Sequence, residues 1–436
     1  MHAHRVLVVG IALAFAACGD DGGSHVEPVA PTANLAREIV DTRLAIDVAA
    51  KTGTATITFG ASSDPGASLE VGDLTIATVT LAGTKAPAGD VPFAVAAKQL
   101  DLGLPVATEN LTVEIAYTWV NHESFQGASK NGYTLIWPYY CGNVFPCHSA
   151  PSDGTTFTLD VTGAAAGTTA VFPPTIPGEA PSYQIAWAIG DYTQLDLGTT
   201  TAGTLVSMWH LPANAARAAK GGANLVAAFD WLETTIGPYK FGNHVGTVDV
   251  AWPRGAFGGM EHHPRWHVGS AAIDDEETNV HEAAHGWFGD GIRIQCWEDF
   301  VLSEGTVSYL AARALDVVAP TVGATVWQGY TTDLAALAPT DPVWPQSCGM
   351  VDVIEDNLFS RAPYMRGAFF YKGVADKVGA DKLDEALHAF YMAHSGGAAT
   401  MQDMLETIQT VTGYDATACA QTWLKDAAIP TPGSCP

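Results

Sequence analysis

Residues 258–290 read GGMEHHPRWHVGSAAIDDEETNVHEAAHGWFGD, and the last ten of them contain a metal-binding pattern. His281 and His285 are four residues apart, so on a helix both imidazoles face the same side and can reach one ion. Glu282 lies beside them, where its carboxylate can accept a proton from an activated water molecule. The alternative is a solvent-exposed helix that carries two histidines by chance. A site used only for structure has no need of Glu282, so the pattern favours catalysis.

A third ligand is expected further along the chain, because catalytic zinc usually takes three protein ligands and leaves one position open. The sequence CWEDFVLSEGTVSYLAARAL, residues 296–315, begins a second helical pattern and contains Glu304. We expect a loop between two antiparallel helices to bring this carboxylate to the two histidines. The prediction is one Zn²⁺ held by His281, His285 and Glu304.

Composition restricts the class of protein. The chain has 436 residues, of which 47% are hydrophobic and 15% charged, with a formal net charge of −26. These values are typical of a globular protein with more than one domain. So acidic a chain repels nucleic acid and anionic membranes, and we expect neither as a partner.

The order of strand and helix patterns predicts a multidomain α+β fold. Residues 35–206 alternate apolar and polar side chains in segments rich in Thr, Val and Ile, which is typical of strands. After Pro212 the periodicity becomes helical, beginning with a segment that ends at Gly237. We therefore expect a β-rich domain over 35–206 and a mainly helical domain over 207–436.

The N-terminus resembles an export signal. Arg5 precedes an apolar run that ends in small residues, which predicts a signal peptide over 1–17. The segment AFAAC, ending at Cys18, resembles a lipoprotein cleavage box; the alternative is an ordinary signal peptide with an incidental cysteine. We expect a flexible tether over 18–34 and an exported bacterial lipoprotein in the periplasm, outer membrane or cell surface. The lipid at Cys18 would then be its one contact with a membrane.

Six cysteines remain after Cys18, and an even number in an exported protein suggests disulfides. A cysteine metal site is disfavoured, because the spacing lacks paired CxxC motifs. Proximity in the sequence favours the pairs Cys141–Cys147, Cys296–Cys348 and Cys419–Cys435.

The segments HEAAHGWFGD and WEDFVLSEGTVSYL resemble the aminopeptidase N family of gluzincin zinc metallopeptidases, whose pattern runs HExxHxWFG, W-x-D and L-x-EG. The resemblance covers most of residues 205–430. It implies a thermolysin-like catalytic domain behind a saddle-like β domain. It also implies a zinc-dependent hydrolase that removes N-terminal amino acids from peptide substrates.

The segment GGMEH, residues 258–262, resembles the family's GxMEN exopeptidase signature. The resemblance implies that Gly258, Gly259, Met260 and Glu261 bind substrate. Glu261 would hold the free α-ammonium by a charge-assisted hydrogen bond, and the glycine backbone would pair with the peptide as an added strand.

Two more segments carry the resemblance. APYMRG resembles the family's Tyr-x-Lys-Gly segment, with Arg366 in place of the lysine, and implies that Tyr364 donates to the oxyanion. FPCHSAP resembles the FPCxDEP segment of the first domain, with Ser149 and Ala150 in place of the two acids.

The sequence departs from the family pattern at the substrate's amine. His262 replaces an asparagine, and the second amine-binding Gln or Glu of the β domain has no counterpart before Cys141, although Glu123 or Gln126 are candidates. The chain ends after the catalytic pattern, where the family has a large helical domain, so we expect an open cleft. The alternatives are an endopeptidase without amine selection and an inactive surface binding protein.

Two predictions concern burial. We expect the cluster of His262, His263 and His267 to lie at the surface. Aromatic residues next to the metal pattern are expected in the core, namely Trp287, Phe288 and Trp297.

Overall fold

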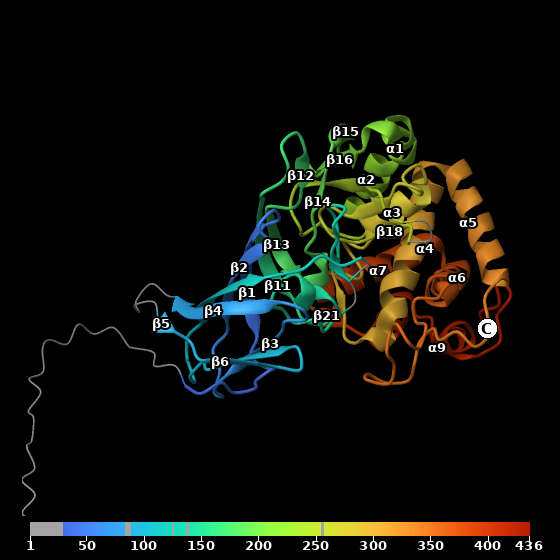
Figure 1. Cartoon of the computed structure of the whole chain (residues 1–436). Coiled ribbons are helices and arrows are strands. Elements are labelled where there is room, and N and C mark those ends of the chain that lie inside the picture. Colours follow the sequence, from blue (N-terminus) through green and yellow to red (C-terminus); the bar gives the residue numbers. More distant parts are fainter. Residues whose placement is uncertain (1–28, 83–88, 124–125, 137–138, 254–256) are drawn as a thin grey trace, which may run out of the picture.

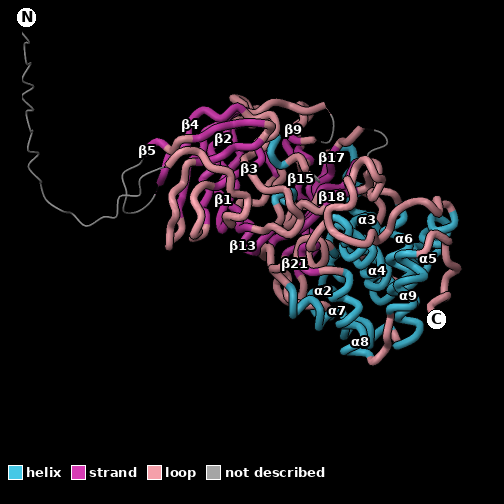
Figure 2. Tube along the Cα trace, turned by 90° about the horizontal axis from the view of Figure 1, so that it is seen from below, coloured by secondary structure: helices cyan, strands magenta, loops and turns pink. Residues whose placement is uncertain are grey.

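The computed structural model describes residues 29–82, 89–123, 126–136, 139–253 and 257–436. The predicted signal peptide, Cys18 and most of the tether lie outside these residues. Strands fill one half of the molecule and helices the other (Figures 1 and 2). Across the described ranges, no helix combines the length and apolar character needed to cross a bilayer.

The first half is built on a mixed seven-stranded sheet with the order β13-β11-β1-β2-β8-β4-β5. In β8, every second side chain is buried, as expected for a sheet with one face on the core. The strands are β1 (Ile39–Asp47), β2 (Thr52–Phe59), β4 (Thr75–Ala82), β5 (Gly89–Asp90), β8 (Leu111–Thr118), β11 (Thr155–Thr162) and β13 (Thr175–Ala180).

Smaller sheets complete the β-rich half. A three-stranded sheet has the order β3-β7-β6, and two ribbons pair β9 with β10 and β12 with β14. Their bounds are β3 (Ala67–Glu70), β6 (Phe93–Ala96), β7 (Gln99–Leu102), β9 (Gly127–Ala128), β10 (Thr134–Leu135), β12 (Thr169–Val171) and β14 (Ala188–Gly190). The β-rich first domain expected from the sequence is therefore found.

A separate five-stranded sheet begins the second half, with the order β15-β16-β17-β19-β18. Its strands are β15 (Thr193–Thr199), β16 (Leu205–His210), β17 (His244–Val250), β18 (Gly259–Met260) and β19 (His267–Gly269). The predicted domain boundary after residue 206 falls inside β16, and the pairing of β15 with β16 puts the junction before β15. β18 lies at the edge of this sheet.

The helices follow. They are α1 (Ala215–Gly221), α2 (Leu225–Thr235), α3 (Glu276–Ala284), α4 (Phe300–Val318), α5 (Pro320–Ala335), α6 (Arg361–Val378), α7 (Ala380–His394), α8 (Met401–Thr412) and α9 (Thr417–Ala420). The short strands β20 (Arg293–Ile294) and β21 (Ala398–Ala399) pair beside them. The segment expected as one helix up to Gly237 is two, broken after Gly221. A side chain at Gly221 would overlap the Ile273 carbonyl, and one at Gly222 the Met208 sulfur.

One apolar core runs through both halves and contains most buried side chains. Trp287 and Phe288 are fully buried in it, and Trp297 is also buried, as predicted. The three disulfides join the cysteine pairs expected from proximity.

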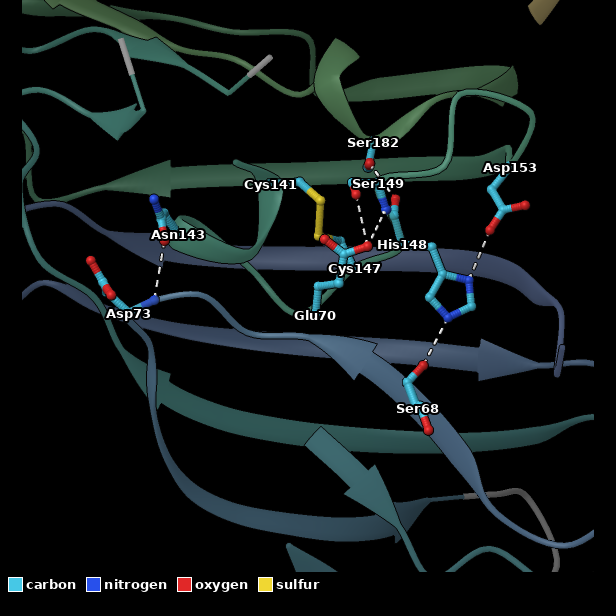
Figure 3. Close-up of a disulfide and its surroundings, with 10 residues drawn as sticks. All are labelled: Ser68, Glu70, Asp73, Cys141, Asn143, Cys147, His148, Ser149, Asp153 and Ser182. Atoms are coloured by element: carbon cyan, nitrogen blue, oxygen red, sulfur yellow. Dashed lines mark hydrogen bonds and ion pairs between the residues drawn. A yellow bond between two sulfur atoms is a disulfide. The ribbon is translucent and has the colours of Figure 1, made fainter. Parts of the chain in front are cut away.

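Around the Cys141–Cys147 disulfide, a glutamate from another strand supplies an acid that the FPCHSAP segment lacks (Figure 3). Glu70 at the end of β3 accepts hydrogen bonds from the Ser149 backbone amide at 2.9 Å and hydroxyl at 2.7 Å. The loop after the disulfide is thus held to the three-stranded sheet.

His148 in the same loop is bound at both ring nitrogens (Figure 3). Nδ1 lies 3.0 Å from a carboxylate oxygen of Asp153, and Nε2 lies 2.8 Å from the backbone carbonyl of Ser68. Both partners can only accept, so the ring must carry two protons to satisfy them. Burial lowers the pKa of His148, but the hydrogen bonds with Asp153 and Ser68 outweigh burial and raise it.

This arrangement predicts a pH-dependent contribution to stability. Because the folded-state pKa of His148 exceeds the unfolded value near 6.5, the stabilisation is present below that value and is lost as pH rises through the folded pKa. His148→Gln should lower the free energy of unfolding by about 1 kcal/mol at pH 5.5, and less at pH 8.5. Urea unfolding of both proteins across this range measures the difference. A difference that stays constant with pH would contradict the doubly protonated ring.

Candidate metal centre and substrate cavity

The structure brings the three predicted metal ligands together. His281 lies in the last turn of α3, His285 is the residue that follows this helix, and Glu304 lies in the second turn of α4. The Glu304 Oε2 atom is 3.1 Å from His281 Nε2 and 3.5 Å from His285 Nε2. All three residues are buried, and their ligand atoms converge on one point.

The surroundings of the histidines orient them for a metal. His285 Nδ1 lies 3.0 Å from the Phe288 carbonyl, which accepts a hydrogen bond from it, so a neutral ring would turn the lone pair of Nε2 toward Glu304. Two imidazole nitrogens and one carboxylate form a donor set that suits Zn²⁺ and leaves one coordination position open. The residues present therefore fit the predicted ion.

The ligands open into a cavity of about 220 Å³ between β18, α3, α4 and α6. Every substrate-binding and catalytic residue predicted from the sequence lines it. The lining comprises Phe257, Gly258, Gly259, Met260, Glu261, Glu277, Thr278, His281, Glu282, His285, Glu304, Ser308, Phe359, Arg361, Tyr364 and Met365.

Glu282 and Glu261 lie close to the metal ligands. One oxygen of each and one nitrogen of His285 are within 4.8 Å of one another. Burial is the largest effect on the pKa of Glu282 and, with the carboxylates of Glu261 and Glu304, raises it well above its ordinary value. Burial also raises the pKa of Glu261. A carboxylate that holds protons more readily suits a group that must take up and release one.

Gly259 explains how the strand comes so near to the catalytic carboxylate. A Cβ built on Gly259 would overlap the side chain of Glu282, so only glycine permits this contact. Gly259 and Met260 form β18, which pairs with β19 on one side and is the edge of the sheet on the other. Its other edge faces the cavity lining and can accept a peptide as a further strand.

Tyr364 lies on the opposite wall. Its ring stacks on the His281 imidazole at 5.9 Å between centres. Gly305 of α4 and Gly367 of α6 place the two helices in backbone contact, and a Cβ on either glycine would overlap the other. Gly305 is next to Glu304, and Gly367 follows Tyr364 by about one helical turn. The close packing of α4 and α6 therefore brings the Glu304 carboxylate and the Tyr364 phenol into one cavity.

The histidine cluster is buried, so the prediction of surface histidines was wrong. His262 Nδ1 donates to the Tyr183 carbonyl of the β-rich half at 2.7 Å. His263 is held by the Tyr239 hydroxyl at 2.7 Å and the Glu282 carbonyl at 2.8 Å. Burial lowers the pKa of His262 to about 4 and that of His263 to about 3, so both rings are neutral. Their partners come from distant segments, which local sequence does not reveal.

The candidates for a second amine anchor lie elsewhere. Glu123 is exposed and pairs with Lys130 at 2.6 Å, and Gln126 donates to the Tyr140 hydroxyl at 3.1 Å. Of the described residues, those lining the cavity all come from the second half of the chain. Neither Glu123 nor Gln126 is among the described residues that line this cavity.

Seven residues of the lining were not predicted from the sequence, namely Phe257, Glu277, Thr278, Ser308, Phe359, Arg361 and Met365. A signal existed for Arg361, which precedes Tyr364 by three residues and so shares its face of a helix. Phe257 and Phe359 had none, because they lie in loops.

Comparisons with known proteins agree with the metal centre described above. Residues 264–423 match the family model described as the peptidase family M1 domain. Aminopeptidase N of Streptomyces lividans is 24% identical over 159 residues, which are 35% of this chain and 18% of that protein. Leucine aminopeptidase 2 of Emericella nidulans is 25% identical over 302 residues, 61% of this chain and 46% of that protein. The chain thus spans less than half the length of these relatives.

Solved structures match nearly the whole chain. The M1 zinc metallopeptidase from Deinococcus radiodurans superposes with a TM-score of 0.74 at 20% identity, covering 91% of this chain and 96% of that one. A mutant of it bound to a Tyr-Ser-Ala substrate gives a TM-score of 0.77 at 19% identity, with the same coverage. The chain thus has the two-domain fold of these M1 zinc metallopeptidases, and its residues 264–423 match the peptidase family M1 domain.

Proposed function

We propose that the protein is a zinc-dependent aminopeptidase that removes N-terminal residues from peptides. The observation that carries the proposal is the meeting of His281, His285 and Glu304 with two further carboxylates, Glu282 and Glu261, in one cavity. The similar proteins named above are aminopeptidases, and solved structures of similar fold hold a tripeptide or a free amino acid, which supports this reading.

His281, His285 and Glu304 would hold the ion. Bound zinc supplies a Lewis acid that polarises the scissile carbonyl and makes water more acidic. Glu282 takes the proton of the attacking water and returns it to the leaving amine. Tyr364 donates its hydroxyl to the oxyanion. Burial, followed by the charges of Glu304 and Glu261, raises the pKa of Tyr364 well above its ordinary value, so the phenol stays a donor.

Selection of the N-terminus falls to Glu261 and β18. Glu261 is buried and lies on the same wall as the strand edge, next to the catalytic group. A peptide that pairs with Gly258 and Gly259 places its first residue beside this carboxylate, which attracts the α-ammonium. The scissile bond then lies one residue away.

Glu282→Gln should retain zinc yet lose turnover. The amide keeps the size of the side chain but cannot take a proton, so kcat should fall by roughly 10²–10⁴-fold, the usual contribution of a general base. Hydrolysis of leucine anilide and metal analysis of the same purified samples measure both properties. A variant with unchanged kcat would remove Glu282 from the mechanism.

Glu304→Gln is the matched control, because the same chemical change falls on a metal ligand four residues into α4. It should lose zinc after dialysis, whereas Glu261→Gln should retain it. If Glu261→Gln lost zinc and Glu304→Gln retained it, the ion would instead be held by Glu261, Glu282 and His285.

An endopeptidase is the second candidate, favoured by the lack of a second amine anchor among the described residues that line the cavity. Aminopeptidase action predicts hydrolysis of leucyl peptides with a free amine and none of their N-acetylated forms. Glu261→Gln should reduce kcat/KM for the free peptides by about tenfold or more, because a buried charge-assisted hydrogen bond is lost. Equal cleavage of free and acetylated peptides would support the endopeptidase.

We also propose export and lipidation at Cys18, supported by the sequence of Arg5 and the apolar run before that cysteine. The full chain expressed in bacteria should incorporate labelled palmitate and fractionate with membranes, and Cys18→Ala should do neither. Incorporation that persists in Cys18→Ala would refute the assignment.

A further inference from the structure

Arg361 is the first residue of α6 and lines the cavity that holds the metal ligands. It is the one Lys or Arg among the described residues of this lining, which also include the carboxylates of Glu261, Glu277, Glu282 and Glu304. Neither the metal site nor the capture of the N-terminus uses it.

The position of Arg361 is set by its neighbours. It precedes Tyr364 by three residues on α6, and its guanidinium carbon lies 5.8 Å from the centre of the Tyr364 ring. One Nη atom donates to Asp333 of α5. The other Nη atom and Nε have no hydrogen-bond partner among the residues described. Arg361 is exposed at the mouth of the cavity, so these donors are open to a ligand.

We propose that Arg361 binds the terminal α-carboxylate of short peptides on the leaving-group side of the scissile bond, so that di- and tripeptides are the preferred substrates. This rests on the proposed aminopeptidase function, in which Glu261 holds the other end. A planar guanidinium with free donors is suited to a carboxylate.

The dimensions agree with one or two residues beyond the scissile bond. The centre of the Tyr364 ring is 5.9 Å from the centre of the His281 ring and 5.8 Å from the guanidinium carbon of Arg361. An extended peptide advances about 3.3–3.6 Å per residue. A carboxylate one or two residues beyond the scissile bond therefore lies about 3–7 Å further along, a length similar to the separation of Arg361 from the Tyr364 ring.

Charge makes the site selective. The lining carboxylates repel an anionic group, whereas Arg361 attracts one. Glu277, a lining carboxylate on α3, accepts a hydrogen bond from the Tyr330 hydroxyl at 2.5 Å. Peptides whose carboxylate lies further along gain nothing from Arg361, so they bind less well.

The test compares three substrates with the same first residue: leucyl-alanine, leucyl-alaninamide and leucine anilide. In the unmodified protein, leucyl-alanine should have the higher kcat/KM of the two peptides. Arg361→Gln should lower kcat/KM for leucyl-alanine by about tenfold or more, mainly through KM, and change the other two less than twofold. Calorimetric binding of leucyl-alanine to Glu282→Gln, with and without Arg361→Gln, should show the same loss without turnover.

Arg43→Gln is the matched control, because Arg43 is also exposed and paired with an aspartate, Asp41, but lies on β1. It should leave all three substrates unchanged. Equal losses on the amide and the anilide in Arg361→Gln would show a structural role and overturn the proposal. Glutamate anilide serves as a further substrate; a loss confined to it would assign Arg361 to the carboxylate of an acidic first side chain and would also overturn the proposal.

The same measurements separate failure of the proposed aminopeptidase function from failure of the proposed role of Arg361. If leucine anilide and both peptides are all uncleaved by the zinc-loaded protein, the aminopeptidase proposal falls, and the role of Arg361 with it. If the anilide is cleaved but the free and amidated peptides are cleaved equally, only the role of Arg361 is overturned.

Discussion

The convergence of Glu304 on His281 and His285 is the contact on which the rest of the second half depends. The two histidines come from one end of α3, and the carboxylate comes from the start of α4. Neither helix can shift along the other without separating these ligand atoms. The edge strand β18, the Tyr364 ring and the buried carboxylates of Glu261 and Glu282 all lie around that point.

Like charges in a small space shape the chemistry of the cavity. Glu261, Glu282 and Glu304 are all buried there, and water screens them poorly. Their mutual repulsion is relieved by cations, which are a divalent ion at one point and a protonated amine at another. The same field that would destabilise an empty site therefore favours both groups that the proposed reaction needs.

The sequence was most informative where spacing alone constrains geometry. Two histidines four apart, a glutamate at the start of the next helix and the glycines before Met260 predicted the centre of the cavity. The cysteine pairs followed from proximity. The burial of His262 and His263 could not be predicted from the local sequence, because their partners Tyr183 and Tyr239 come from distant segments. Nor did helical periodicity reveal the break after Gly221, where the chain passes too close to Ile273 and Met208 for a side chain at Gly221 or Gly222. Local sequence patterns do not predict contacts between segments that are distant in the sequence.

The glycine pair between α4 and α6 has a consequence for how such a site can vary. Since Gly305 and Gly367 touch through their main chains, no side chain sets the separation of the two helices at that point. Residues facing the cavity can then be exchanged, and its selectivity altered, while the distance from the ion to the opposite wall is preserved. The contact between α4 and α6 thus keeps the helix separation constant while the specificity of the cavity changes.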